Sequence, residues 1–275
     1  MEKENAKNQM YKELLNTEML EAYKNKFIKV PGEFFKYLHN DDKLLIVLLS
    51  LFKRKTIYNT ITITLKDIIL ENNFIPTKGK NRNIEQFKVT LFNLIKLNII
   101  EFYNPKLNEI IKEEQKWEEK ICKLKNQKQI ETKTKEYTLL FETITLNTPI
   151  NLRFNEENVN ELTTNNFTML QFNITNIFKT ICTNNPKIKM NNLTNIYLMI
   201  KRLVDANAYY SNSGWNISIE YFSKHLKLSR QTVCDTIKEL EKYKIIFVTR
   251  KEHKNYYRLT ERNNVLKAMK DHLLT

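Results

Sequence analysis

The chain has 275 residues, 41% of them hydrophobic and 28% charged, and 45 Lys and Arg outnumber 31 Asp and Glu to give a formal net charge of +14. This content excludes a wholly disordered protein, and the length favours two small domains. Only 3 Gly and 5 Pro are present, which favours long helices over folds with many tight turns. The basic excess predicts a polyanionic partner, either nucleic acid or an anionic membrane, although AT-rich coding would also enrich lysine without a binding role.

Motifs for catalysis, metal binding or membrane insertion are not found in the sequence. Cys122, Cys182 and Cys234 are far apart and form no CxxC pair, so neither a zinc site nor a disulfide framework is expected. There is no GxxxxGK[ST], HExxH or GxSxG motif, and we expect no enzymatic activity, no metal and no cofactor. The N-terminus has no apolar signal core, and no stretch reaches the ~18 apolar residues of a membrane span. These features predict a cytoplasmic protein with no membrane partner.

The first half of the chain predicts one domain, residues 27–150, after a polar arm over residues 1–26. Two helices are expected, in "DDKLLIVLLSLF", which is apolar almost all round, and in "IEQFKVTLFNLIKLN", whose apolar residues recur at helical spacing. Between them, residues 60–64 alternate as a short strand, and Thr64 with Asp67 resembles a capping box that begins another helix. The remaining strands are expected at residues 99–103 and 137–146.

A densely charged segment, residues 104–136, separates those last two strands. We expect it to be an exposed helix inserted in the first domain. Ile110, Trp117, Ile121 and Leu124 form a narrow apolar stripe at roughly heptad spacing, which is too small to make a core of its own. The stripe must pack on its own domain, pair with another copy, or stay partly disordered. Our hypothesis is pairing, which would make the protein a homodimer.

The second half predicts a connector over residues 151–184, with a weak helical signal in its last part, and a second domain over residues 185–275. The first helix of this domain lies in "NNLTNIYLMIKRLVDANAYY" and is followed by the short strand "WNIS". Ser218 and Ser229 are in place to cap two further helices around the turn "KLS". Two strands, "IIFVTR" and "YYRLT", surround "KEHKN", and residues 261–275 are expected to form a C-terminal helix.

Both domains therefore have the predicted order helix, strand, helix, turn, helix, strand, wing, strand. This is the order of the winged-helix variant of the helix-turn-helix. The sequence predicts a mostly α fold with small β wings (α+β), made of two tandem winged helix-turn-helix domains. The two copies are separated by roughly 150 residues, which indicates a domain duplication rather than a solenoid.

The helix that begins at residue 230 has the pattern of a DNA recognition helix. An apolar stripe at spacings of four and three is expected to be buried, and it consists of Val233, Ile237 and Leu240. Off this stripe, near the N-terminal end where helix-turn-helix proteins contact base edges, lie Arg230, Gln231, Thr232 and Asp235. Ser229 at the cap can serve the helix, a phosphate, or both.

Cations around the strand pair predict contacts with the DNA backbone or the minor groove. The candidates there are Arg250, Lys251, His253, Lys254, Tyr256 and Arg258. In the first domain, the basic loop before the third helix and that helix itself add Lys78, Lys80, Arg82 and Lys88. The same helix has a carboxylate, Glu85, near its start. For the first domain, DNA contact and a dimerisation or protein-docking role therefore both stay open.

The order and length of these units are similar to those of the replication initiator proteins of theta-type plasmids. The stretch "FIKVPGEFF…DDKLLIVLLSLFKR" also resembles the opening of initiators from plasmids of low-GC Gram-positive bacteria. This resemblance implies binding of double-stranded DNA at direct repeats of a replication origin, with monomers and dimers in different roles. It also implies host replication proteins as partners.

Other functions are compatible with the same pattern. A transcriptional regulator, or a plasmid partition or conjugation accessory factor, would share the fold. A further alternative is a replisome-loading scaffold in which the domains mainly bind protein. A scaffold would lack the steep salt dependence that counterion release gives to DNA binding.

Overall fold

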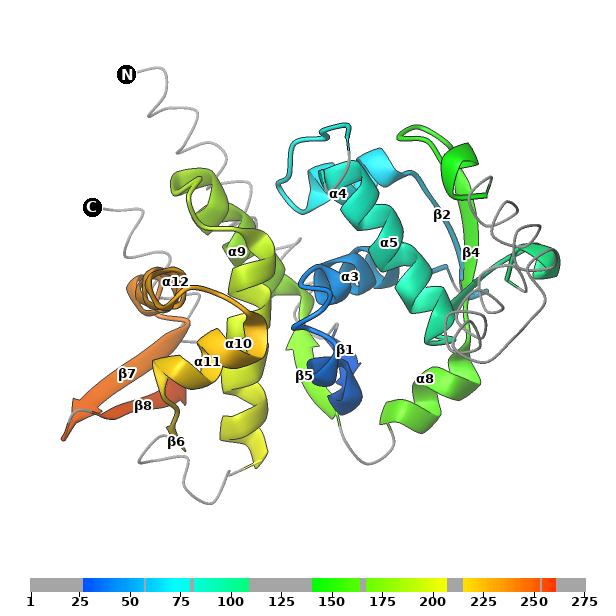
Figure 1. Ribbon diagram of the computed structural model, residues 1–275. Helices are drawn as coiled ribbons and strands as arrows, with labels where there is room; N and C mark the ends of the chain where they lie inside the picture. Colours follow the sequence, from blue (N-terminus) through cyan, green and yellow to red (C-terminus); the bar gives the residue numbers. More distant parts are fainter. Residues whose placement is uncertain are drawn as a thin grey trace, which may run out of the picture. The chain divides into compact units, whose positions relative to one another are not determined.

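The computed structural model describes residues 27–56, 58–79, 82–108, 140–163, 167–206, 215–252 and 254–260 (Figure 1). These residues form α-helices and small antiparallel sheets, a mixed fold compatible with the predicted α+β class. Residues 43–165 make one compact unit, here called the central unit, and the described residues before and after it make the other, the terminal unit. Predictions that lie outside the described residues concern the arm 1–26, the helix 261–275, Lys80, His253, Ile110, Trp117, Ile121 and Leu124.

The central unit packs helices on one face of a three-stranded antiparallel sheet. Its elements are α3 (Leu44–Arg54), β2 (Thr60–Ile63), α4 (Leu65–Glu71), α5 (Asn83–Lys96), β3 (Ile100–Phe102), β4 (Ile150–Phe154) and α8 (Glu156–Thr163). β4 lies between β2 and β3, pairing Leu152 with Ile61 and Phe154 with Ile100. Buried and exposed side chains alternate along β4, so one face of the sheet lies in the core.

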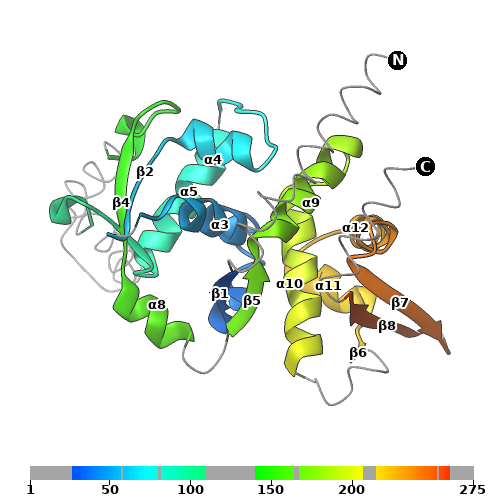
Figure 2. The same ribbon diagram turned by 180° about the vertical axis from the view of Figure 1, so that it is seen from behind.

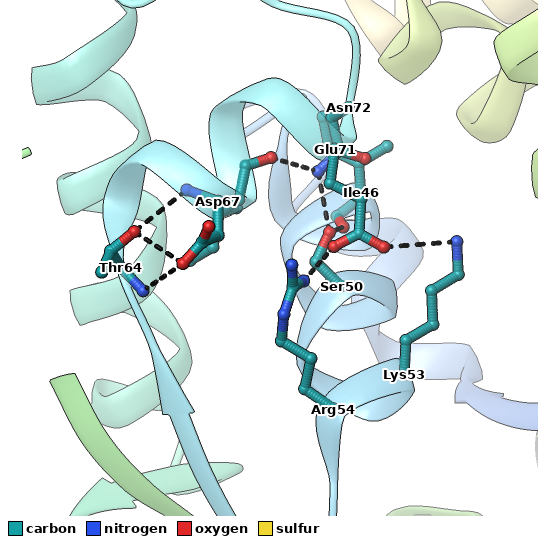
Figure 3. A network of polar contacts seen from close by, with 9 residues as sticks. Ile46, Ser50, Lys53, Arg54, Thr64, Asp67, Glu71 and Asn72 are labelled. Carbon is teal, nitrogen blue, oxygen red and sulfur yellow. Dashed lines mark hydrogen bonds and ion pairs between the residues drawn. The ribbon is translucent and has the colours of Figure 1, made fainter. Parts of the chain in front are cut away.

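The predicted capping box begins α4 (Figure 3). The backbone N–H of Asp67 donates to Thr64 Oγ1 at 3.1 Å, and the backbone N–H of Thr64 donates to the Asp67 carboxylate at 3.1 Å. The Thr64 hydroxyl also donates to this carboxylate, at 2.7 Å. These bonds satisfy N–H groups that would otherwise lack a partner at the start of the helix. The cap directs three apolar residues of α4 into the core: Leu65, Ile68 and Ile69.

Polar contacts also join the end of α4 to α3, which is buried over most of its surface as its apolar sequence predicted (Figure 3). The buried Asn72 amide donates to Ser50 Oγ and to the Ile68 carbonyl, both at 2.8 Å. These bonds offset the cost of removing the amide from water. Beside them, Glu71 forms ion pairs with two cations of α3, Lys53 and Arg54.

The terminal unit is built from both ends of the described chain. Its elements are β1 (Phe27–Pro31), η1 (Gly32–Lys36), β5 (Phe167–Gln171), α9 (Phe172–Asn184), α10 (Met190–Ala206), β6 (Trp215–Asn216), α11 (Ile219–Leu226), α12 (Arg230–Lys242), β7 (Ile246–Lys251) and β8 (Lys254–Leu259). β1 and β5 form an antiparallel ribbon in which the buried Ile28 pairs with the buried Leu170. In the three-stranded sheet, β8 lies between β6 and β7 (Figure 2).

The bounds of these units differ from those of the predicted domains. Residues 27–42, expected in the first domain, contribute β1 and η1 to the terminal unit. Arg202 of α10 holds them there, because its guanidinium donates to the Gly32 carbonyl and lies 4.8 Å over the Phe35 ring. Residues 151–184, expected as a connector, instead supply β4, α8, β5 and α9.

The third strand of the central unit is not where the sequence placed it. The alternation over residues 137–146 predicts a strand, but residues 140–143 form a helical turn, and β4 is the strand that pairs with β2 and β3. Leu140 and Ile144 are both buried, and a spacing of four suits a helical turn as well as a strand. The strand that completes this sheet instead has the alternating sequence "INLRF" of β4, in which Ile150, Leu152 and Phe154 are buried.

The two units share one element order and one strand order. α3, β2, α4, α5, β3 and β4 correspond to α10, β6, α11, α12, β7 and β8, and in each sheet the last strand lies between the other two. The correspondence extends to single residues. Thr64 and Ser218 cap the second helix of each set. Thr90 and Thr236 are buried in the third helix, and each hydroxyl donates to the carbonyl four residues earlier.

The turn after the third helix is also the same in both units. Asn98 and Lys244 adopt left-handed backbone conformations, with φ of 57° and 53°. The next residue, Ile99 or Ile245, donates its N–H to the carbonyl of a leucine five residues back, at 3.0 and 2.9 Å. Thr90 and Thr236 are 146 residues apart, as are Asn98 and Lys244. α5 and α12 therefore align residue by residue.

Candidate nucleic-acid interface

α12 is anchored at the end that the sequence singled out. Ser229 Oγ accepts the backbone N–H of Thr232 at 3.1 Å, and the two hydroxyl groups lie 2.8 Å apart. Ser229 therefore serves the helix in this structure, as an N-cap. The predicted stripe is buried, with no member more than 4% exposed, and it comprises Val233, Ile237 and Leu240. Burial of this stripe fixes which side of α12 faces outward.

Two of the predicted base-contacting residues, Arg230 and Gln231, are exposed and are each held by a carboxylate. The Arg230 guanidinium lies 2.5 Å from the carboxylate of Glu220 in α11, with the side chains 73% and 59% exposed. Gln231 Nε2 donates to Asp235 Oδ1 at 2.7 Å. With the half-buried Thr232, the predicted residues form one polar surface at the start of α12.

The outward side of α12 continues with Lys238, which the sequence analysis missed. Lys238 is exposed and follows Gln231 and Asp235 at helical spacing, so the three share one side of the helix. Within the described part of the chain, no ion pair or hydrogen bond engages its ammonium group. The sequence could have predicted that Lys238 faces outward, because position 238 lies seven residues after position 231 and off the buried stripe.

The hairpin of β7 and β8 turns one face outward. Antiparallel partners share a face of a sheet, and the pairs on the outward face are Phe247–Arg258, Thr249–Tyr256 and Lys251–Lys254. Phe247 is 42% exposed, whereas Tyr257 on the opposite face is fully buried. Burial raises the pKa of the Tyr257 hydroxyl to about 12. Tyr257 is therefore a core residue, and Tyr256 is the tyrosine that lies on the outward face.

The cations of the hairpin are in different environments. Lys251 and Lys254 are exposed next to each other near its tip, and no described residue pairs with them. Arg250 lies 3.0 Å from the Glu241 carboxylate of α12. Arg258 donates to Thr249 Oγ1 at 3.5 Å, which is a long hydrogen bond. Over residues 215–260, Lys and Arg outnumber Asp and Glu two to one, so this surface has a positive potential.

Lys88 does not occupy the surface position that the sequence predicted for it. It is only 8% exposed, and its ammonium donates to the Phe141 carbonyl at 2.8 Å and lies 4.7 Å over the Phe141 ring. Burial lowers the pKa of Lys88. The prediction that Lys88 contacts DNA is therefore wrong for this structure. Lys78 and Arg82 are exposed ahead of α5, as expected.

The same helical turn covers a second residue of α5. Phe92 is 1% exposed and packs edge-to-face on Phe141, with ring centroids 5.5 Å apart. In the alignment of the two helices, Phe92 corresponds to the exposed Lys238, and Lys88 corresponds to the half-buried Cys234. One side of α5 is therefore closed where the same side of α12 faces solvent.

No group of three or more His, Cys, Asp or Glu side chains in the described ranges is arranged to hold a metal ion. None of the helices in those ranges is long and apolar enough to cross a membrane. Comparisons with protein family models, curated proteins and solved structures found no match.

Proposed function

We propose that both units are winged helix-turn-helix domains and that the terminal unit binds double-stranded DNA in a sequence-specific manner. The fold proposal is supported by the shared element order and by the sheets in which the last strand lies between the other two. In such a domain the third helix enters the major groove and the hairpin contacts the backbone or the minor groove. In the terminal unit these elements are α12 and β7–β8.

One observation carries the proposal: the outward side of α12 is polar and basic, and no described residue covers it. Arg230 and Gln231 present side chains suited to guanine and adenine edges in the major groove. Lys238 lies further along the same side, and Lys251 and Lys254 lie at the hairpin tip. These three lysines can neutralise phosphates, which positions the protein without reading sequence.

DNA titrations of the full chain test this proposal. A fluorescent duplex pool with a randomised core is first enriched by binding to the wild-type protein, and the enriched duplex is compared with a random duplex at several salt concentrations. We expect tighter binding to the enriched duplex and a steep fall of affinity with salt. Equal affinities would remove sequence specificity from the proposal, and no binding to either duplex would remove DNA binding altogether.

The narrower biological role that we propose is initiation of plasmid replication at origin repeats. The tandem duplication and the opening segment "FIKVPGEFF" support it through the resemblance described above. The test is to footprint the protein on the DNA beside its own gene and to ask whether the bound direct repeats support replication of a plasmid. Binding to repeats that control only transcription or partition would favour a regulator or an accessory factor.

For the central unit, a protein-binding role is a second candidate, and it belongs to the scaffold class of function. Three large apolar residues of its α4–α5 region are exposed by 45–76%, namely Leu70, Ile75 and Val89. Apolar exposure is unusual for a surface that contacts phosphates and is common in protein interfaces. Sedimentation of wild-type protein against Val89→Lys distinguishes a second copy of the chain from a host replication protein as the partner.

A further inference from the structure

Two arginines and three lysines around α12 differ in one respect that the proposed function does not use. Arg230 and Arg250 each have a glutamate within ion-pair distance, at 2.5 Å for Glu220 and 3.0 Å for Glu241. Lys238, Lys251 and Lys254 are exposed, and no carboxylate pairs with them in the described ranges. Carboxylates are thus placed on Arg230 and Arg250 and not on these three lysines, whereas Lys242 in the last turn of α12 lies 3.8 Å from the Glu239 carboxylate.

We propose that Glu220 is a specificity-determining residue that holds Arg230 away from phosphates on non-specific DNA. Glu241 does the same for Arg250. This inference rests on the proposed function, because it concerns how the α12 surface discriminates between duplexes. It assigns the two glutamates a role as internal competitors of the DNA backbone.

The small energy of the Arg230–Glu220 ion pair favours a role in discrimination between duplexes over a role in folding stability. Both side chains of the Arg230–Glu220 pair are more than half exposed, and such pairs contribute little to folding because solvent screens them. A pair this weak is readily exchanged for a guanine edge, which offers the guanidinium two acceptors in fixed geometry. On a random duplex no guanine is fixed opposite Arg230, and the guanidinium can leave Glu220 only for whichever phosphate lies within reach, so the glutamate competes better there. Specificity arises when unfavourable contacts with the wrong partner are built in.

The proposal requires that Glu220 act through Arg230 and not merely through its own charge. Glu220 lies in the first turn of α11, where a carboxylate interacts favourably with the helix dipole. A glutamate with only that role would change stability and repel all DNA equally. A role through the arginine predicts that the effect of Glu220 disappears once Arg230 is replaced.

The experiment is a double-mutant cycle in the full chain with Glu220→Gln, Arg230→Gln and the double variant. Binding is measured on a random-sequence duplex and on the duplex that the wild-type protein enriches from a randomised pool. We expect Glu220→Gln to tighten binding to the random duplex about two- to fivefold. It should also steepen the slope of log K against log salt on that duplex by about 0.9, the value for one additional neutralised phosphate. Affinity for the enriched duplex should change less, so the specificity ratio falls.

A matched control is Glu33→Gln, which removes the same charge and an exposed ion pair with Lys36 at 3.7 Å in the same unit. It should leave the ratio unchanged, and thermal unfolding of each variant checks that it is folded. An unchanged ratio in Glu220→Gln, or the same effect in the Arg230→Gln background, overturns the inference while the proposed function stands. Absence of DNA binding by the wild-type protein overturns both.

Discussion

α5 and α12 have the same core and different surfaces. Each buries three apolar residues at matching positions, Phe87, Leu91 and Leu94 in one and Val233, Ile237 and Leu240 in the other. The helical turn 140–143, which lies between β3 and β4, then covers one side of α5 through Phe141. No such turn separates β7 from β8, which are joined by a tight hairpin. Two units with the same element order can thus keep the same packing while a turn in one of them covers a surface that the other presents.

The outward faces of the two sheets differ in a similar way. In the central unit, Arg153 lies opposite Glu101 and pairs with it at 2.5 Å. At the matching positions of the terminal unit, Arg258 lies opposite the exposed Phe247. The arginine is retained, but its carboxylate is replaced by an aromatic ring. This difference leaves more positive charge on the terminal unit, in agreement with the proposal that this unit binds DNA.

The largest expected effect comes from exchanging the residues that make α5 and α12 different. Phe92→Lys should destabilise the central unit by about 3–5 kcal/mol or more, because it removes a buried ring and inserts a charge into the core. Lys238→Phe should change stability by less than about 1 kcal/mol, since position 238 is exposed. Thermal and urea unfolding of the full chain measure both. Similar decreases in the two variants would mean that the helices are not covered differently.

The next largest effect is expected from removing the proposed base contacts of α12. Arg230→Ala and Gln231→Ala should each reduce discrimination between the enriched and the random duplex by about 1–3 kcal/mol. The control on α5 is Glu85→Ala, at the position aligned with Gln231, combined with Gln86→Ala at the next position, and it should leave discrimination unchanged. If the α5 variant loses specificity and the α12 variants do not, the recognition helix has been assigned to the wrong unit.

The sequence predicted the features that depend on neighbouring residues and missed those that depend on residues far away in the chain. The caps at Thr64, Ser218 and Ser229 and the buried stripe of α12 followed from spacing alone. The burial of Lys88 did not, because the turn that covers it lies about 50 residues later and appears as a strand in its own pattern. Likewise, nothing local to residues 27–31 indicates that this strand pairs with β5. Long-range pairing decides both features.

Neutralising the lysines at the hairpin should give a smaller effect, which does not depend on DNA sequence. Lys251→Ala with Lys254→Ala should weaken binding to every duplex and reduce the salt slope by about 0.9 for each phosphate that the variant no longer neutralises. The comparison is Lys78→Ala with Arg82→Ala, the exposed cations ahead of α5. We expect the slope of that variant to match the wild type, because the neighbouring side of α5 is covered. An equal decrease of the salt slope in both variants would indicate that the central unit also contacts DNA.

The smallest expected effect is a difference in stability between variants that remove the helix cap of α4 and variants that remove the helix cap of α11. Thr64 and Asp67 cap α4 reciprocally. Ser218 Oγ accepts the Tyr221 N–H at 3.1 Å, and Tyr221, which takes the place of Asp67 in this cap, has no carboxylate to complete a capping box. Thr64→Ala should therefore cost more than Ser218→Ala, within a range of about 0.5–2 kcal/mol.

The pH dependence of the two cap variants should differ as well. The hydrogen bond from the Thr64 side chain lowers the pKa of Asp67 below its ordinary value of 3.8. A carboxyl group with a lowered pKa in the folded state stabilises the protein above its unfolded pKa, and that contribution is lost as the pH falls through the folded value. The stability difference between wild type and Thr64→Ala should therefore shrink below pH 3.8. The Ser218→Ala difference should stay constant, because no titrating group takes part in that cap. Thermal unfolding midpoints between about pH 7 and pH 3 measure both differences, and parallel curves for the two variants would contradict the role assigned to Asp67.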